Sequence, residues 1–109
     1  MNYRKVAIIV AMDKEFQQLE SILSNKQTEE IGHGRLVTGR LGDKKIALQK
    51  CGIGKVNSAV GATLLIQQFS PDLVISSGCA GGADAKLNVG DVVVARQCAY
   101  HDAYCGDNC

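Results

Sequence analysis

Residues 73–82 constrain the fold of this chain more than any other stretch. A short apolar run follows Pro71-Asp72, and such a run is typical of a strand buried on both faces. The run then breaks into small residues and glycines. Backbone without bulky side chains lets a ligand approach closely, so a break at the carboxyl end of a buried strand predicts either a ligand site or a tight turn.

Composition limits the classes of partner. The 109 residues are enough for about one domain with a modest core. The net charge is +1 and aromatic residues make up 5% of the chain. The sequence has no basic stripe with interleaved aromatics, so it does not predict nucleic-acid binding. No apolar run approaches the roughly 20 residues of a membrane helix. Residues 1–10 predict a strand rather than a signal peptide, because acidic residues follow the apolar segment at once.

The cysteines favour free thiols over a metal site. There are five of them: Cys51, Cys79, Cys98, Cys105 and Cys109. The last three have the spacing C-x6-C-x3-C with His101 among them, which lacks the paired C-x2-C elements of zinc sites. Unpaired thiols are typical of a reducing compartment, so we expect a cytoplasmic protein with no bound metal.

The first half of the chain predicts a strand, a helix and a hairpin. Residues 5–10 are β-branched and predict a central strand. Asp13 is a suitable N-cap for a helix that runs to Ser24 with apolar residues at helical spacing. Residues 25–34 predict a loop or a weak edge strand. Gly42-Asp43 between two apolar-rich segments, residues 35–41 and 44–50, predicts a hairpin with a primed turn.

The second half predicts a helix and two further strands. A glycine-rich turn at residues 51–55 leads into a helix over residues 56–69, whose buried face is expected to carry Ala59, Ala62, Leu65 and Ile66. Strands are expected at residues 73–76 and 90–96. The order of elements predicts the α/β class, a mixed central sheet with flanking helices.

Part of the predicted sheet has no predicted helix to cover it. A mostly parallel sheet needs helices on both faces, and residues 97–109 predict no helix. We therefore expect either that another chain covers that side, or that residues 1–109 are the N-terminal portion of a single longer domain.

Glu15 is the first candidate for chemistry. It lies one turn into the first predicted helix, near the end of the first strand, where α/β folds bind ligands. A carboxylate there suits a general base that activates a water. A first-turn glutamate is also favoured by the helix dipole or as a capping partner, and position alone favours this structural interpretation.

Two other motifs give weaker signals. Gly52-Ile53-Gly54-Lys55 is not a P-loop, because the G-x-x-x-x-G-K-[ST] pattern is missing, so it predicts a tight turn that opens a helix. Cys79 follows Gly78 in the opening stretch. It would be a nucleophile only with a stabilised thiolate, which the sequence does not predict.

Five short motifs in a fixed order carry a resemblance to a known family. They are AMDKE at residues 11–15, CGIGKVN at 51–57, GCAGG at 78–82, VGDVV at 89–93 and YHD at 100–102. Each motif is unspecific alone. Together, over residues 5–104, they resemble the N-terminal half of 5'-methylthioadenosine/S-adenosylhomocysteine nucleosidases, within the nucleoside phosphorylase superfamily.

The resemblance implies hydrolysis of the N-glycosidic bond of 5'-thio-adenosines to adenine and a thioribose, with no metal or organic cofactor. Glu15 matches the glutamate that binds and activates the attacking water. Met12 and Ile53 match apolar residues that line the ribose and alkylthio part of the site. Ala80 and Gly81 match backbone beside the purine. An oxocarbenium-like centre needs a placed water and an anionic neighbour, as in glycoside hydrolysis.

The chain departs from the family in two respects. Cys79 stands where the family commonly has a serine near the water, and a thiol is a weaker hydrogen-bond donor. The aspartate that protonates adenine and the Met-Glu pair that holds the ribose hydroxyls have no counterpart in residues 1–109. We therefore expect these 109 residues alone to show no turnover. The resemblance also implies a homodimer in which residues 100–109 close over the partner's site.

Two alternatives remain open at this point. One is a phosphate-dependent purine nucleoside phosphorylase, for which Arg40, Lys50, Lys55 and Arg96 are the available cations. The other is a non-catalytic module that binds purine nucleosides.

Overall fold

The computed structural model describes residues 2–32, 34–103 and 106–107 of the chain. They divide into two units, residues 1–79 and 80–109. The first unit contains a five-stranded sheet and two helices. Its elements are β1 (Lys5–Val10), α1 (Asp13–Glu20), β2 (Ser24–Ile31), β3 (Gly34–Leu41), β4 (Lys44–Lys50), α2 (Lys55–Phe69) and β5 (Leu73–Ser76).

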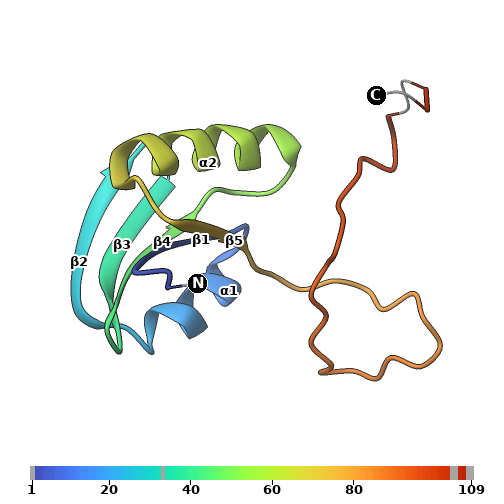
Figure 1. Cartoon of the computed structure of the whole chain (residues 1–109), viewed down its shortest axis with the longest axis horizontal. Helices are drawn as coiled ribbons and strands as arrows, with labels where there is room; N and C mark the ends of the chain where they lie inside the picture. Colours follow the sequence, from blue (N-terminus) through green and yellow to red (C-terminus); the bar gives the residue numbers. More distant parts are fainter. Residues whose placement is uncertain (1, 33, 104–105, 108–109) are drawn as a thin grey trace. The chain divides into compact units, whose positions relative to one another are not determined.

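The sheet is mixed, with strand order β2-β3-β4-β1-β5 (Figure 1). β1 is central and runs parallel to both neighbours, so Ile8 pairs with Leu48 on one side and Ile75 on the other. β2, β3 and β4 form an antiparallel meander. The predicted hairpin is confirmed: Gly42 has a φ of 63° between β3 and β4, which glycine adopts at little cost. The expected α/β class with a mixed sheet is likewise confirmed.

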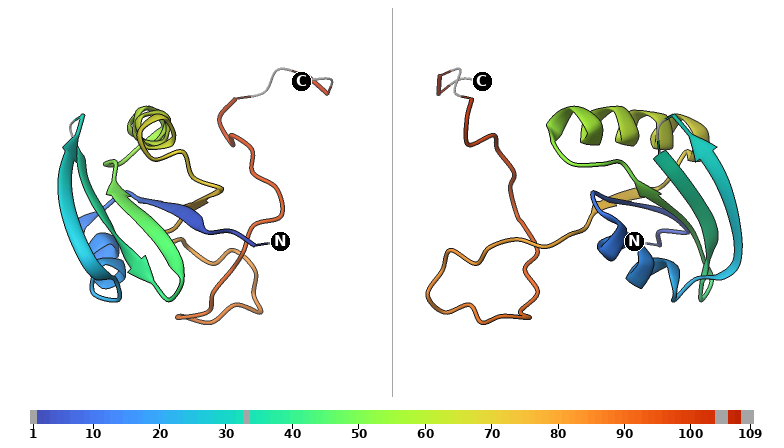
Figure 2. Two further views of the ribbon diagram at one scale, coloured as in Figure 1. Left: turned by 60° about the vertical axis from the view of Figure 1, so that its left-hand side comes forward. Right: turned by 180° about the vertical axis from the view of Figure 1, so that it is seen from behind.

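The two helices lie on opposite faces of the sheet (Figures 1 and 2). A separate hydrophobic core lies under each helix. The core on the α1 side contains Val6, Val10, Phe16, Leu23, Val37, Ile46 and Leu48. The core on the α2 side contains Ala7, Ile31, Leu36, Ala47, Leu65 and Phe69. β1 and β4 supply side chains to both cores, which explains the uninterrupted apolar runs at residues 6–10 and 46–48.

α2 packs closely on the sheet through a glycine. A Cβ at Gly61 would lie 2.7 Å from the Cβ of Cys51 and 3.4 Å from Ile9 Cδ1, so any larger residue would push the helix outward. The buried row of α2 is Gly61, Leu65 and Phe69. The expected face was wrong at Ala59 and Ile66, which are exposed, because the close approach at Gly61 sets the rotation of the helix.

α1 is shorter than its apolar spacing predicts. It ends at Glu20, and the backbone amides of Ile22 and Leu23 bond to carbonyls three residues earlier, which tightens and ends the last turn. Its N-cap is Met12 rather than the expected Asp13. Residues 24–31 form an edge strand, β2. Of the two structures predicted for residues 25–34, a loop or a weak edge strand, the second is confirmed.

The second unit differs from expectation. The described part of residues 80–109 contains no helix and no strand, so the expected strand at 90–96 is absent. Val92, Val93 and Val94 are 91%, 70% and 86% exposed. The physical reason is that a strand needs a hydrogen-bonded neighbour, and no described strand pairs with this segment. Within the described residues, no helix has the length and apolar character needed to cross a membrane.

Candidate functional site

Three parallel strands end at the same edge of the sheet. β1 leads into Ala11 and Met12, β4 into Cys51 and Gly52, and β5 into Ser77 and Gly78. The amides of Cys51 and Ser77 continue the pairing on either side of β1, donating to the carbonyls of Val10 and Ile9. The carboxyl edge of parallel strands is where open α/β sheets bind ligands.

Glu15 joins two of these strand ends. Its Oε1 accepts a hydrogen bond from the Met12 amide at 3.0 Å, and its Oε2 accepts one from the Cys79 amide at 2.9 Å. The first bond is the capping interaction that the sequence suggests for a glutamate in the first turn. The second bond reaches 64 residues along the chain, so the half-buried carboxylate is fixed between the ends of β1 and β5.

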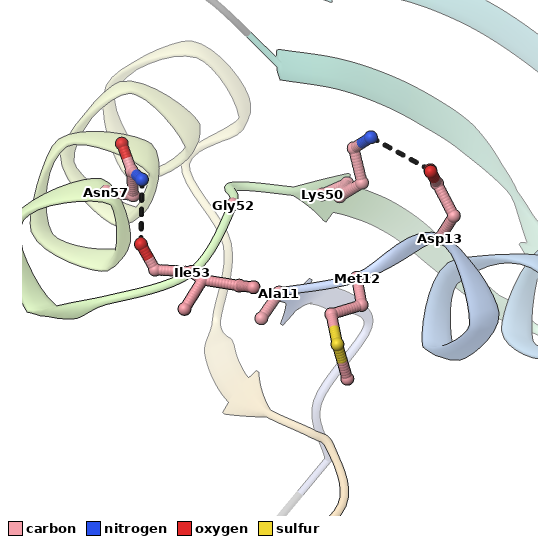
Figure 3. Close-up of a pocket in the computed structure, with 7 residues that line it drawn as sticks. All are labelled: Ala11, Met12, Asp13, Lys50, Gly52, Ile53 and Asn57. Carbon is pink, nitrogen blue, oxygen red and sulfur yellow. Dashed lines mark hydrogen bonds and ion pairs between the residues drawn. The ribbon is translucent and has the colours of Figure 1, made fainter.

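A pocket of about 350 Å³ lies at the start of α1, the helix that carries Glu15 (Figure 3). Its lining comes from the segments after β1 and β4 and from the start of α2: Ala11, Met12, Asp13, Lys50, Gly52, Ile53 and Asn57. Met12 and Ile53, both expected at the site from the sequence, therefore share one pocket. Their side chains are exposed, so the pocket offers an apolar surface to a ligand.

The turn that carries Ile53 is held in an unusual conformation. Gly52 and Gly54 have φ values of 91° and 97°, which side chains rarely tolerate. Asn57 Nδ2 donates to the Ile53 carbonyl at 2.7 Å and so fixes the turn to α2 (Figure 3). Asn57 was missed as a site residue. The signal for it was an asparagine shortly after a glycine turn, because Asn side chains often bond nearby backbone.

The charged residues of the pocket are paired with each other. Lys50 Nζ lies 2.8 Å from Asp13 Oδ1, and the dashed line in Figure 3 marks this ion pair. Lys50 is thus already neutralised by a carboxylate of the site, which weakens its case as a phosphate ligand.

Cys51 lies near the carboxylate, at the end of β4. Burial raises the pKa of its thiol; a backbone hydrogen bond lowers it by less, and the negative charge of Glu15 adds a still smaller rise. The Sγ donates to the carbonyls of Val10 at 3.4 Å and Gly52 at 3.2 Å. A thiol held neutral in this way is a structural group rather than a nucleophile.

The remaining expected residues lie at or beyond the boundary of the first unit. Cys79 contributes its backbone amide to Glu15, and its thiol is free and exposed. Ala80 and Gly81 follow it in the second unit and are exposed. Tyr104, Cys105, Asn108 and Cys109, from the predicted partner-covering tail, lie outside the described residues. Within the described part of the chain, no three His, Cys, Asp or Glu side chains gather as a metal site would require.

A mixed α/β sheet with a fixed carboxylate and an apolar pocket at its carboxyl edge defines a class of proteins that bind small molecules there. The sequence matches the Phosphorylase superfamily over residues 5–108, and the chain belongs to that superfamily.

The chain is similar to solved structures of nucleosidases and of a futalosine hydrolase. A 5'-methylthioadenosine/S-adenosylhomocysteine nucleosidase from Neisseria meningitidis, in complex with methylthio-immucillin-A, is 39% identical with a TM-score of 0.77; the match covers 81% of this chain and 38% of that one. The corresponding nucleosidase from Colwellia psychrerythraea 34H, in complex with adenine, is 36% identical with a TM-score of 0.78, covering 83% and 37%. A futalosine hydrolase mutant from Helicobacter pylori is 29% identical with a TM-score of 0.71, covering 81% and 40%.

The chain therefore spans less than two fifths of the length of the two nucleosidases described. The recognised family resemblance is confirmed at the level of the superfamily and of these nucleosidase structures.

Proposed function

We propose that this chain contributes to an N-glycosyl hydrolase that cleaves 5'-thio-adenosine nucleosides, such as methylthioadenosine and S-adenosylhomocysteine, into adenine and a thioribose. The observation that carries the proposal is the carboxylate of Glu15, held by the Met12 and Cys79 amides at the carboxyl edge of the sheet. The likeness to nucleosidases in complex with adenine and methylthio-immucillin-A supports the class of substrate.

In this proposal Glu15 binds and activates the attacking water. Each carboxylate oxygen accepts one backbone N–H and keeps further lone-pair capacity for a water. The carboxylate orients that water, takes its proton as it attacks the anomeric carbon, and stabilises the positive charge that develops on the sugar. The purine departs with the electrons of the glycosidic bond and takes up a proton to give adenine; residues 1–109 hold no counterpart of the aspartate that would donate it.

Met12 and Ile53 supply the apolar surface for the ribose and the 5'-alkylthio group. They share a pocket of about 350 Å³ with the glycine turn, and Asn57 holds that turn in place. An apolar pocket with a few fixed polar groups is the usual form of a small-molecule site. Ala80 and Gly81 remain the residues proposed to lie beside the purine.

The experiment that tests this reaction class is product analysis in the absence and presence of phosphate. The full-length encoded protein is incubated with methylthioadenosine, and adenine and the sugar product are separated by chromatography. The proposal expects adenine and free methylthioribose at the same rate in both buffers. A requirement for phosphate, with methylthioribose-1-phosphate as product, would instead identify a phosphorylase. Futalosine is tested as a second substrate, because the chain is also similar to a futalosine hydrolase from Helicobacter pylori.

We further propose a cytoplasmic homodimer. The outward side of α2 supports a second copy as partner, since Val56 and Val60 lie one turn apart and are 77% and 52% exposed. Apolar side chains that follow one another on a helix are favourable to bury in an interface. Free thiols at Cys79 and Cys98 are compatible with a reducing compartment. Sedimentation of Val60→Asp beside the unsubstituted protein tests the interface, and a monomer in both would contradict it.

A further inference from the structure

Gly78 makes an unusual contact for a glycine of this chain. A Cβ built on Gly78 would lie 2.5 Å from Glu15 Oε2, and the three nearest atoms to it all belong to the Glu15 carboxyl group. Gly34 and Gly61 are also crowded, by backbone or core atoms, and Gly32 is crowded by Leu64 Cδ1. At Gly78 the crowding partner is the charged end of a flexible side chain.

The backbone of Gly78 does not itself require glycine. Its φ lies outside the positive range that the turn glycines Gly52 and Gly54 occupy. An alanine there is therefore compatible with the chain conformation. Glycine is needed at position 78 because the carboxylate of Glu15 occupies the space that a side chain would fill.

We propose that Gly78 is a positioning residue for Glu15. Because Gly78 has no side chain, the carboxylate can lie directly against the backbone after β5, where it reaches the Cys79 amide with Oε2 while Oε1 keeps the Met12 amide. The assignment of the contact rests on geometry alone, and its catalytic importance rests on the proposed function.

A methyl group at position 78 would act on the position of the carboxylate rather than on the fold. Glutamate has rotatable bonds and lies at a half-exposed surface, so it would swing away and exchange its two amide hydrogen bonds for water. The sheet and both cores would be unaffected. The attacking water would then lose its fixed base, and turnover would fall without a matching loss of substrate binding.

The test is residue-resolved amide hydrogen exchange in ¹⁵N-labelled protein. In Gly78→Ala we expect the Cys79 amide to exchange about tenfold faster, the factor set by loss of one hydrogen bond to a charged acceptor. Glu15→Ala should accelerate the same amide to the same extent, and the double variant should show no further change. Gly81→Ala is the matched control for exchange, because a Cβ there meets nothing within 4 Å and its φ is not positive.

Two further readouts separate positioning from stability. Urea unfolding of Gly78→Ala should weaken the folding equilibrium no more than Glu15→Ala does, since both variants lose the same two hydrogen bonds and the crowding partner can move. In the full-length enzyme kcat should fall while KM stays nearly constant. A Cys79 amide that exchanges equally fast in the parent, Gly78→Ala and Glu15→Ala would overturn the inference, as would an amide that stays protected in Gly78→Ala.

These outcomes do not depend on the proposed reaction. If no nucleoside is hydrolysed but the Cys79 amide responds as expected, the proposed function fails and the positioning role of Gly78 stands. If hydrolysis is found and the amide does not respond, the reverse holds.

Discussion

Residues 5–10 and residues 90–96 both contain a run of β-branched residues, but their structures differ. Each run alone predicts a strand. Residues 5–10 form β1, which is hydrogen-bonded on both sides and places Ala7 and Val10 in two cores. Residues 90–96 form no strand, and their valines are exposed.

The difference lies in the neighbours rather than in the residues. β1 lies between β4 and β5, and α1 and α2 cover the two faces of the sheet, so its backbone groups and side chains are satisfied together (Figure 1). The described residues offer no such partners to the segment 90–96. β-Propensity expresses how well a residue fits a paired and half-buried surface, so it has little effect where that surface is absent.

Truncating one side chain in β4, the neighbour of β1, and one in residues 90–96 should give the largest contrast. Leu48 is fully buried at the centre of β4, and Leu48→Ala should lower the free energy of unfolding by about 3 kcal/mol through lost burial and the cavity left behind. Val93→Ala should change it by less than about 0.5 kcal/mol, because the side chain is exposed. Urea unfolding followed by circular dichroism measures both. Equal losses would show that Val93 is buried in solution.

The reactivity of thiols should differ between the first and the second unit, by a smaller factor than the stability effects above. Burial raises the pKa of Cys51 in the first unit, whereas Cys98 in the second is free and exposed. Iodoacetamide near pH 8 should therefore modify Cys51 about tenfold more slowly than Cys98, since the thiolate is the reacting form. Mass spectrometry of digested protein gives both rates. The control is the same reaction in concentrated urea, where the two rates should converge; a persistent difference there would contradict the structural cause.

The smallest expected effect concerns acid stability of the first unit. The amides of Lys5 and Arg4 donate to the Asp72 carboxylate and lower its pKa below the ordinary value of 3.8. A pKa lowered by folding contributes stability above the ordinary value, and this contribution is lost as the pH falls through the folded-state pKa.

Asp72→Asn should therefore flatten the dependence of stability on pH below about pH 4, while leaving its slope near pH 6 unchanged. Urea unfolding midpoints over this range measure the slope. Parallel curves for the parent and the variant would show that the carboxylate has the same pKa in both states.

Local patterns were sufficient to predict most of the elements of residues 1–79, but β5 is an exposed edge strand rather than the strand buried on both faces that its apolar run predicts. Alternation around Gly42, the β-branched run of β1 and the glycine turn before α2 each predicted the element found. The rotation of α2 was not predictable from periodicity, because Gly61 sets it through contact with Cys51 and Ile9. Such a contact joins segments distant in sequence, which no local pattern encodes.

The site was predictable in part for a similar reason. Met12, Glu15 and Ile53 follow strands, and parallel strands bring their carboxyl ends together. The Cys79 amide as partner of Glu15, and the space that Gly78 leaves for the carboxylate, depend on the pairing of β5 beside β1. Glu15 takes the capping role that its position predicts, because one oxygen accepts the Met12 amide, and its other oxygen also reaches the Cys79 amide. Its role as a general base stays a proposal.

The most direct test of the proposed role of Glu15 is the rate of adenine release from methylthioadenosine by the full-length protein and its Glu15→Gln variant. Glutamine keeps the shape of the side chain but cannot take a proton, and only one of its two terminal groups can accept a backbone N–H. We expect a fall in kcat of about 10²- to 10⁴-fold with an unchanged unfolding midpoint. Adenine release at the parent rate by Glu15→Gln would contradict it.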